Sequence, residues 1–319
     1  MKTAKQCMLT GMLVLIAALA MVAPAAADPY LGGDPLVTAN GTNGIVTGGL
    51  WFDAYPGFEF AYPTPIVHSF NPLPCDPEDI AWARLYVDTY IGNMQANYPL
   101  NTTVEFDGAG LGNYDTLGIE IMNTTYTFPE GSGEDGTVWI NDHCNRVTSD
   151  CLMWYDVTDD IVSSSVAARV HTAKPDGTQP LDGRVKMIAL VVAYDDGDFD
   201  KIRYWVNQGH DTDSYVTDDE GYSYVGETGF DTSAVTAVDS ATLTAIYLGS
   251  YNGNYAFESN ALPWSNPQQG SYFGYQSWNV TSYVDTGGIS TMTFDRNSTH
   301  SGQYSGYFKI PLALLTVEE

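Results

Sequence analysis

The sequence predicts an all-β protein built from two tandem antiparallel β-sandwich repeats of jelly-roll type, and three observations lead to this prediction. Short runs rich in Val, Ile, Thr, Tyr and Phe alternate with clusters of Gly, Asn, Asp and Pro, whereas helical periodicity is hard to find. Hydrophobic residues make up 44% and aromatic residues 13% of the chain, which is enough for a packed core. The third observation is an internal duplication.

The duplication shows as a constant offset over the ends of the two copies. Asp156-Val157-Thr158 matches Asn279-Val280-Thr281, and Lys186 falls on Lys309 at the same offset. Any two β-domains share residue types, so chance similarity is the alternative. The matched glycine, lysine and acidic positions favour a true repeat.

These features predict a division of the chain, including an insertion in the first copy that the second lacks. The expected order is a signal peptide at 1–27, a Gly- and Pro-rich segment at 28–79 that adds strands to the first domain, a first β-repeat at 80–200 with an inserted loop at 112–150, a connecting segment at 201–238 and a second β-repeat at 239–319.

The N-terminus has the features of a secretory signal peptide. Lys2 and Lys5 precede an apolar run, and small residues follow it up to Ala27. A retained anchor helix is the alternative, but Thr10 and Gly11 interrupt a run that is already short. We therefore expect a secreted, extracellular protein at the cell surface that does not span the membrane.

The charge excludes one class of partner. Asp and Glu number 39 against 12 Lys and Arg, a formal net charge of −27. Nucleic acids and anionic lipids require cationic contacts, so neither is an expected partner. The expected partners are other copies of the chain, with envelope glycans as a further possibility.

Three cysteines follow the predicted signal peptide. Cys144 and Cys151 are close enough to form a disulfide in an exported protein, which leaves Cys75 as a candidate for an intermolecular disulfide or a buried thiol. A zinc site at His143, Cys144 and Cys151 is an alternative, although paired C-x2-C spacing is absent.

Acidic turns suggest a structural calcium ion, while no other cofactor is expected. The first turn contains the alternating carboxylates Asp195, Asp196, Asp198 and Asp200. A second acidic segment contains Asp211, Asp213, Asp218, Asp219 and Glu220. Solvated turns without a metal are the alternative for both.

No catalytic signature is present, so an enzyme is not expected. The five histidines are scattered, and neither an H-E-x-x-H pair nor a G-x-S-x-G elbow occurs. A pair of glycosidase carboxylates is not excluded by the sequence.

Five sequons mark candidate N-glycosylation sites, because an exported chain meets the glycosylation machinery. They lie at Asn40, Asn101, Asn123, Asn279 and Asn297.

Two functional hypotheses follow. In the first, apolar strands pair edge to edge between copies, with Ile188, Leu190, Val192, Ile246 and Leu248 as the assembly residues. Ordinary central strands are the alternative, although Pro311 indicates an edge or a strand end. In the second hypothesis, aromatic residues stack on sugars in a secreted carbohydrate-binding or adhesive module. The candidate residues are Trp264, Tyr272, Tyr275 and Trp278.

The order of several motifs resembles exported surface proteins of methanogenic archaea that carry a domain of unknown function. The motifs are Ala83-Arg84-Leu85-Tyr86, Tyr155-Asp156-Val157-Thr158, Leu190 to Asp196, Ile202-Arg203-Tyr204-Trp205 and Gly209. The resemblance implies a cell-envelope context, in which sheath or surface-layer subunits are made of protein. A self-assembling structural envelope protein is therefore the first expectation for function.

Overall fold

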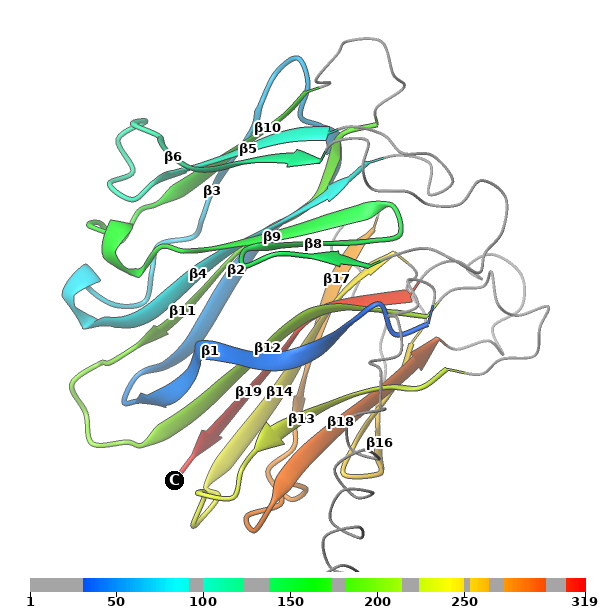
Figure 1. Cartoon of the computed structure of the whole chain (residues 1–319). Helices are drawn as coiled ribbons and strands as arrows, with labels where there is room; N and C mark the ends of the chain where they lie inside the picture. Colours follow the sequence, from blue (N-terminus) through cyan, green and yellow to red (C-terminus); the bar gives the residue numbers. More distant parts are fainter. Residues whose placement is uncertain are drawn as a thin grey trace, which may run out of the picture.

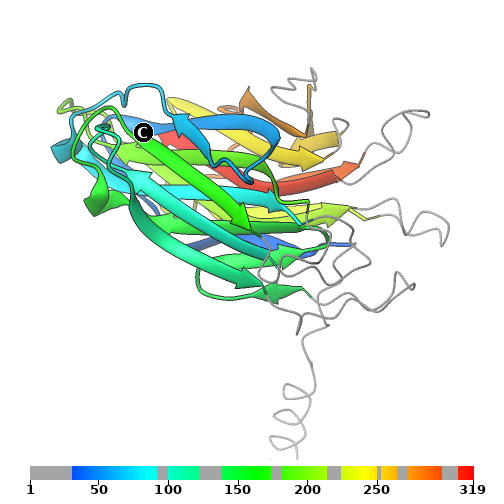
Figure 2. The ribbon, with the colours of Figure 1, turned by 90° about the horizontal axis from the view of Figure 1, so that it is seen from above.

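Four antiparallel sheets stack face to face in the computed structural model (Figure 1). The structure describes residues 31–91, 100–122, 138–173, 182–213, 224–249, 253–263, 272–296 and 308–319. Most strands lie along one common axis when the stack is seen from above (Figure 2). Within these ranges, no helix is long and apolar enough to cross a membrane. The all-β prediction is confirmed.

The first domain consists of two facing sheets. The six-stranded sheet has the order β2-β11-β4-β9-β8-β7, with β2 Gly49–Phe60, β11 Arg184–Tyr194, β4 Ile80–Tyr90, β9 Asp150–Asp156, β8 Cys144–Val147 and β7 Trp139–Ile140. The outer four-stranded sheet has the order β3-β10-β5-β6, with β3 Ile66–Ser69, β10 Ala167–Ala173, β5 Leu100–Asp107 and β6 Asp115–Met122. Two short 3-10 helices connect strands of the two sheets: η1 Pro77–Asp79 lies between β3 and β4, and η2 Thr158–Asp160 lies between β9 and β10.

The second domain repeats this plan. Its five-stranded sheet has the order β1-β12-β19-β14-β17, with β1 Asp34–Val46, β12 Ile202–Asp213, β19 Phe308–Glu318, β14 Ser240–Gly249 and β17 Phe273–Asn279. Its outer sheet has the order β13-β18-β15-β16, with β13 Gly226–Asp231, β18 Ile289–Arg296, β15 Gly253–Phe257 and β16 Asn260–Leu262. The order β2-β11-β4-β9 corresponds to β12-β19-β14-β17, and β3-β10-β5-β6 corresponds to β13-β18-β15-β16.

The repeated Asp/Asn-Val-Thr turn makes the same hydrogen bonds in both domains. The hydroxyl of Thr158 accepts a hydrogen bond from Ala83 N, and that of Thr281 accepts one from Ala241 N, both at 2.9 Å. In each turn the first side chain accepts a bond from the threonine N–H. The sequence repeat is thus a repeat of hydrogen bonds that tie the end of one strand to the start of its neighbour.

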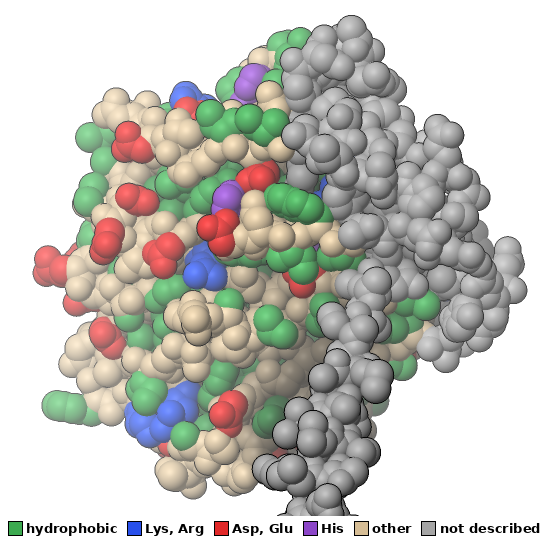
Figure 3. Space-filling view, viewed as in Figure 1, with side chains coloured by type: hydrophobic (Ala, Val, Ile, Leu, Met, Phe, Trp, Pro, Cys, Tyr) green, Lys and Arg blue, Asp and Glu red, His purple; other side chains and the backbone are tan. Residues whose placement is uncertain are grey.

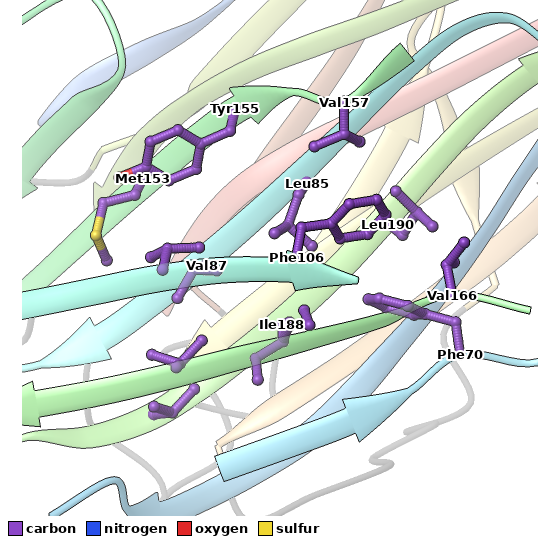
Figure 4. Close-up of a cluster of buried hydrophobic side chains, with 14 of the residues drawn as sticks. Phe70, Leu85, Val87, Phe106, Met153, Tyr155, Val157, Val166, Ile188 and Leu190 are labelled. Carbon is purple, nitrogen blue, oxygen red and sulfur yellow. The ribbon is translucent and has the colours of Figure 1, made fainter. Parts of the chain in front are cut away.

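Three apolar layers fill the spaces between the four sheets. One layer packs inside the first domain, where Leu85, Val87, Phe106, Ile188 and Leu190 point toward one another (Figure 4). A second fills the second domain. The third joins the domains and contains residues such as Tyr86, Met187, Val206 and Leu312. The two inner sheets are therefore buried on both faces.

Double-sided burial explains the long apolar runs and corrects the assembly prediction. The run that contains Ile188, Leu190 and Val192 is β11, which lies between β2 and β4. The strand that contains Ile246 and Leu248 is β14, which lies between β19 and β17. All five side chains are fully buried. Both edges of each strand are already hydrogen-bonded, so these strands cannot pair with another copy.

Pro311 also differs from the expectation of an edge or a strand end. It lies in β19, between β12 and β14, where the register shifts on both sides. A bulge leaves a position unpaired, so a proline that cannot donate is tolerated inside a central strand.

Three segments differ from the expected division of the chain. The expected connection at 201–238 contains β12 and β13, which begin the second domain. The segment 28–79 contributes β2 and β3 to the first domain, but its β1 pairs with β12 of the second. Within 112–150, β6 has a counterpart in β16, and β7 and β8 are the additional strands. Residues 1–27 lie outside the described residues.

Candidate functional site

A groove of about 560 Å³ opens beside the last residues of β9. Strand β8 pairs with β9 as far as Met153, and Trp154 N then donates to the carbonyl of His143 at 2.8 Å. Beyond this bond the edge of β9 faces the groove instead of a strand. The lining residues come from β4, β6, β9 and the turn before β8, and they are Arg84, Leu117, Gly118, Ile119, Asp142, His143, Trp154, Tyr155 and Asp156.

His143 organises the polar side of the groove. Its ring nitrogens contact Oδ1 of Asp142 at 2.6 Å and Oε2 of Glu120 at 2.7 Å. Burial disfavours a charged ring, but hydrogen bonds to these two carboxylates outweigh that effect and raise the pKa of His143. The indole N–H of Trp154 donates to the carbonyl of Asp142 at 3.0 Å, which fixes the ring at the rim.

Tyr155 lines the inner side of the groove, with its ring in the core of the first domain and its hydroxyl buried. The side chain is buried, and within the described part of the chain its hydroxyl has no hydrogen-bond partner. Burial, followed by the charge of Glu120, raises the pKa of Tyr155, so the hydroxyl keeps its proton. A Cβ at Gly118 would lie 2.6 Å from the tyrosine ring, so glycine leaves the room that this side chain occupies.

A buried cluster of charges lies between the two domains, at one end of the apolar layer that joins them. The ammonium groups of Lys186 on β11 and Lys309 on β19 both donate to Oδ2 of Asp150 on β9, at 2.8 Å and 2.5 Å. Lys309 also donates to the hydroxyl of Thr148 at 2.7 Å. His210 on β12 faces the same carboxylate, with 4.0 Å between Nε2 and Oδ2.

The protonation of the cluster follows from burial and from these neighbours. Burial alone would raise the pKa of Asp150, but the two ammonium charges lower it. Burial and then the charge of Asp150 raise the pKa of Asp88 far above its usual range, so this carboxyl is neutral. Burial and the charge of Lys309 lower the pKa of His210 to about 3.

Burial and neighbouring charges also give the two lysines different pKa values. Burial lowers the pKa of Lys309 to about 8, and the nearby charge of Lys186 acts in the same direction. Burial acts to lower the pKa of Lys186, but the charge of Asp150 and the hydrogen bond to it outweigh burial and raise the pKa.

Metal binding is a poor fit to this cluster. Ligand atoms of Asp88, Asp150 and His210 lie within 4.8 Å of one another, which is close enough for a cation. However, Oδ2 of Asp150 already accepts two ammonium groups, so a divalent ion would meet two positive charges.

The predicted calcium turn is ordered by its own hydrogen bonds. Asp195 accepts from Thr47 N, Asp196 from Asp198 N, and Asp198 from Asp200 N. Within the described residues, these carboxylates do not form a group of three ligand atoms within 4.8 Å. Calcium binding there stays a prediction that requires a rearrangement.

The second acidic segment does not form a solvated loop in its described part. Asp211 is buried and accepts from the hydroxyl of Tyr224 at 2.9 Å, and Asp213 lies 3.8 Å from Arg296. Asp218, Asp219 and Glu220 lie outside the described residues.

The structure brings Cys144 and Cys151 together but leaves them as free thiols. Their Sγ atoms are 3.0 Å apart in the core, so the disulfide stays a prediction. His143 points toward the groove carboxylates, which does not fit the zinc alternative. Cys75 is half-buried beside Asp195 and Asp196 in a separate cavity of about 380 Å³. Burial, with the charges of Asp79 and Asp76, raises its pKa to about 11.

The glycosylation candidates lie in different surroundings. Asn40 and Asn279 are exposed, whereas Asn101 is half-buried in β5. Asn123 and Asn297 lie outside the described residues.

The aromatic residues expected to bind sugar do not form one surface. Trp278 is buried and donates to the carbonyl of Pro263, and Tyr275 packs against Phe52 between the domains. Tyr272 is 41% exposed and packs on Phe58. Trp264 lies outside the described residues.

Of the groove residues, only His143 was a candidate site residue in the sequence, and there as a zinc ligand. The groove residues come from four separate segments, and only the fold brings them together. The match of Lys186 with Lys309 was a usable signal for the buried cluster, because a lysine repeated inside an apolar strand has to find a partner there.

The fold and the groove define a two-domain β-sandwich protein with an open, mixed polar and aromatic surface site on its first domain. The face shown in Figure 3 carries acidic side chains at several places and basic side chains at few. The chain belongs to the family described as "Protein of unknown function (DUF3344)", whose profile matches residues 29–318. No curated protein matches the sequence.

Several solved structures are distantly similar. PNGase F from Flavobacterium meningosepticum, described as a glycosylasparaginase, aligns with 12% identity over 87% of this chain and 96% of its own, at a TM-score of 0.27. The ANXUR1 extracellular domain from Arabidopsis thaliana aligns with 9% identity over 90% and 97%, at 0.26. The Streptomyces avermitilis alpha-L-rhamnosidase aligns with 14% identity over 92% of this chain and 28% of its own, at 0.23. These likenesses are too distant to transfer a site or an activity.

Proposed function

We propose that this protein is a carbohydrate-binding or adhesive module of the cell exterior, and that a saccharide binds in the groove beside Trp154. The observation that carries the proposal is the combination of groups there. The groove joins an aromatic rim residue with the polar side chains of Asp142, His143 and Asp156. Sugars have an apolar C–H face and many hydroxyl groups, so they need both kinds of contact.

The charge of the chain narrows the class of saccharide. With a net charge of −27 and two aspartates in the groove, acidic sugars would be repelled. A neutral saccharide is therefore the proposed ligand.

A glycan array tests this proposal with the purified wild-type chain and two variants. Trp154→Ala is expected to lose binding by about tenfold or more, because the aromatic contact is removed. Tyr272→Ala is the matched control, since this exposed aromatic lies outside the groove. Equal binding by Trp154→Ala and wild type, or loss only in Tyr272→Ala, would contradict the proposed site.

A self-assembling sheath or surface-layer subunit is the second candidate, and one observation supports it. Among the described residues, strand β6 is an edge of its sheet, and its outward residues Ile119 and Ile121 are 58% and 59% exposed. An apolar open edge is suited to strand pairing with another copy. Ile121→Lys should then reduce association in sedimentation experiments, whereas Val162→Lys, at an exposed apolar residue outside any strand, should not.

A further inference from the structure

The buried cluster holds a lysine amine against a carboxylate of the other domain. Nζ of Lys309, on the inner sheet of the second domain, lies 2.5 Å from Oδ2 of Asp150, on the inner sheet of the first. Both side chains are fully buried, and Thr148 accepts a hydrogen bond from the same amine. Water is therefore excluded, and the amine is held in place.

A second carboxyl completes the arrangement. A carboxylate oxygen of Asp88 lies within 4.8 Å of one of Asp150, and neither Asp88 oxygen has a hydrogen-bond partner in the described part of the chain. Leaving buried polar groups unpaired is costly, so a stable arrangement that retains them calls for an explanation. A role for Asp88 in transferring protons to and from Asp150 would explain why its oxygens are left unpaired.

We propose that Lys309 and Asp150 form an intramolecular amide bond that joins the two domains covalently. Nζ of Lys309 attacks Cγ of Asp150, one Cγ–Oδ bond breaks, and one water molecule leaves. No oxidant, reductant or other reactant is required.

The protons balance within the cluster. The ammonium of Lys309 first gives one proton to the carboxylate of Asp150, which produces a neutral amine and a neutral carboxyl. After attack, the nitrogen gives up a second proton and keeps one. Asp88, which is neutral, donates a proton to the leaving oxygen and regains one from the nitrogen, so it ends as it began. Exclusion of water opposes the reverse hydrolysis.

Lys309 is the reacting lysine rather than its repeat equivalent Lys186. A lowered pKa of about 8 gives Lys309 a neutral fraction at neutral pH, whereas the pKa of Lys186 is raised. Lys186 remains charged beside the same Asp150 oxygen and stabilises negative charge on it during attack.

Mass spectrometry of the full chain tests the bond. The wild-type chain is produced in a host that adds no N-glycans, reduced, and digested with trypsin. The expected product is a branched peptide in which 147–169 is joined to 297–319, lighter by one water than the sum of its parts. Trypsin cannot cleave after an amidated Lys309, so the second arm is not cut there. Separate peptides 147–169, 297–309 and 310–319, without the branched product, would overturn the proposal.

Two lysine variants test which amine reacts. Lys309→Arg keeps the positive charge but removes the amine, so the folded variant should show the full intact mass. Lys201→Arg, at a partly exposed lysine that pairs with Glu319 outside the cluster, is the matched control and should keep the loss of one water. A folded Lys309→Arg chain that still loses this water would contradict the assignment. Circular dichroism checks that each variant folds. If a variant does not fold, the tryptic peptides of the wild-type chain still show whether the amide bond is present.

The acid variant tests the role given to Asp88. Folded Asp88→Asn should retain the full mass, because an amide cannot supply the proton. A water loss in this variant equal to that of the wild type would remove Asp88 from the reaction.

Discussion

Lys186 and Lys309 occupy equivalent positions in the two repeats, and their ammonium groups meet at one oxygen of Asp150. The bulge in β11 falls at Lys186, and the register of β19 shifts near Lys309. Both bulges lie next to the layer between the domains. The duplicated lysine therefore serves the contact between the two copies rather than the interior of each.

Removal of the Asp150 carboxylate should destabilise the protein strongly. Asp150→Ala would leave two buried ammonium groups without their acceptor, at a cost of about 3–5 kcal/mol. Chemical denaturation measures this change, and Asp196→Ala, at an exposed aspartate, should cost less than about 0.5 kcal/mol. Similar losses for the two variants would show that neither the ion pairs of Asp150 nor its proposed amide with Lys309 holds the domains together.

Asp211 should make stability depend on pH. Burial, together with the charges of Asp213 and Asp34, raises its pKa from 3.8 to about 8. Between these values the folded protein keeps a proton that the unfolded chain releases. The contribution of this group is therefore full below 3.8 and is lost as pH rises through about 8.

The isosteric variant Asp211→Asn isolates this effect, because an amide does not ionise but can still accept from Tyr224. Its stability relative to wild type should increase between pH 5 and pH 9, by on the order of a few kcal/mol. Denaturation curves at both pH values measure the change. A difference that does not vary with pH would mean that Asp211 is ionised throughout.

A side chain at position 118 should displace Tyr155 and close part of the groove. In Gly118→Val, Cβ would lie 2.6 Å from the ring and 2.7 Å from the hydroxyl of Tyr155. Overpacking of this kind costs about 1–3 kcal/mol, and saccharide affinity should fall with it. Thermal unfolding measures the first effect and the glycan array the second. Unchanged values in both would show that Tyr155 does not need this space.

The three described cysteines should differ in reactivity. Cys144 and Cys151 are fully buried, so neither should react with iodoacetamide in the folded protein. Half-buried Cys75 should react slowly at neutral pH, because its pKa of about 11 keeps it protonated. Alkylation followed by peptide mapping measures all three. Rapid labelling of Cys144 or Cys151 under native conditions would show that the β8–β9 hairpin opens.

The sequence showed that the chain contains a repeat, but it did not show how the two copies pack against each other. The alternation of short strands and turns predicted the β-sandwich, and the Asp156 and Asn279 turns predicted the duplication. An apolar run such as 187–194 shows that both faces of a strand are buried, but not whether a second domain or a second copy covers it. The inner sheets cover each other, which is why the assembly residues lie in the interior.

The groove could not be predicted for a different reason. Arg84, Asp142 and Trp154 have no common spacing in the chain, and they meet only because β9 extends past the end of β8. The aromatic residues chosen from composition, such as Trp278, are mostly used in packing.

An NMR titration tests the central claim, that a neutral saccharide binds beside Trp154, most directly. The indole N–H signals of the tryptophans are followed while the strongest neutral glycan from the array is added to the full chain, and Trp154→Ala assigns the signal at the groove. The account predicts that the Trp154 signal shifts with a saturable dependence on the glycan, while the signal of buried Trp278 stays in place. A titration in which other indoles shift and Trp154 does not would contradict it.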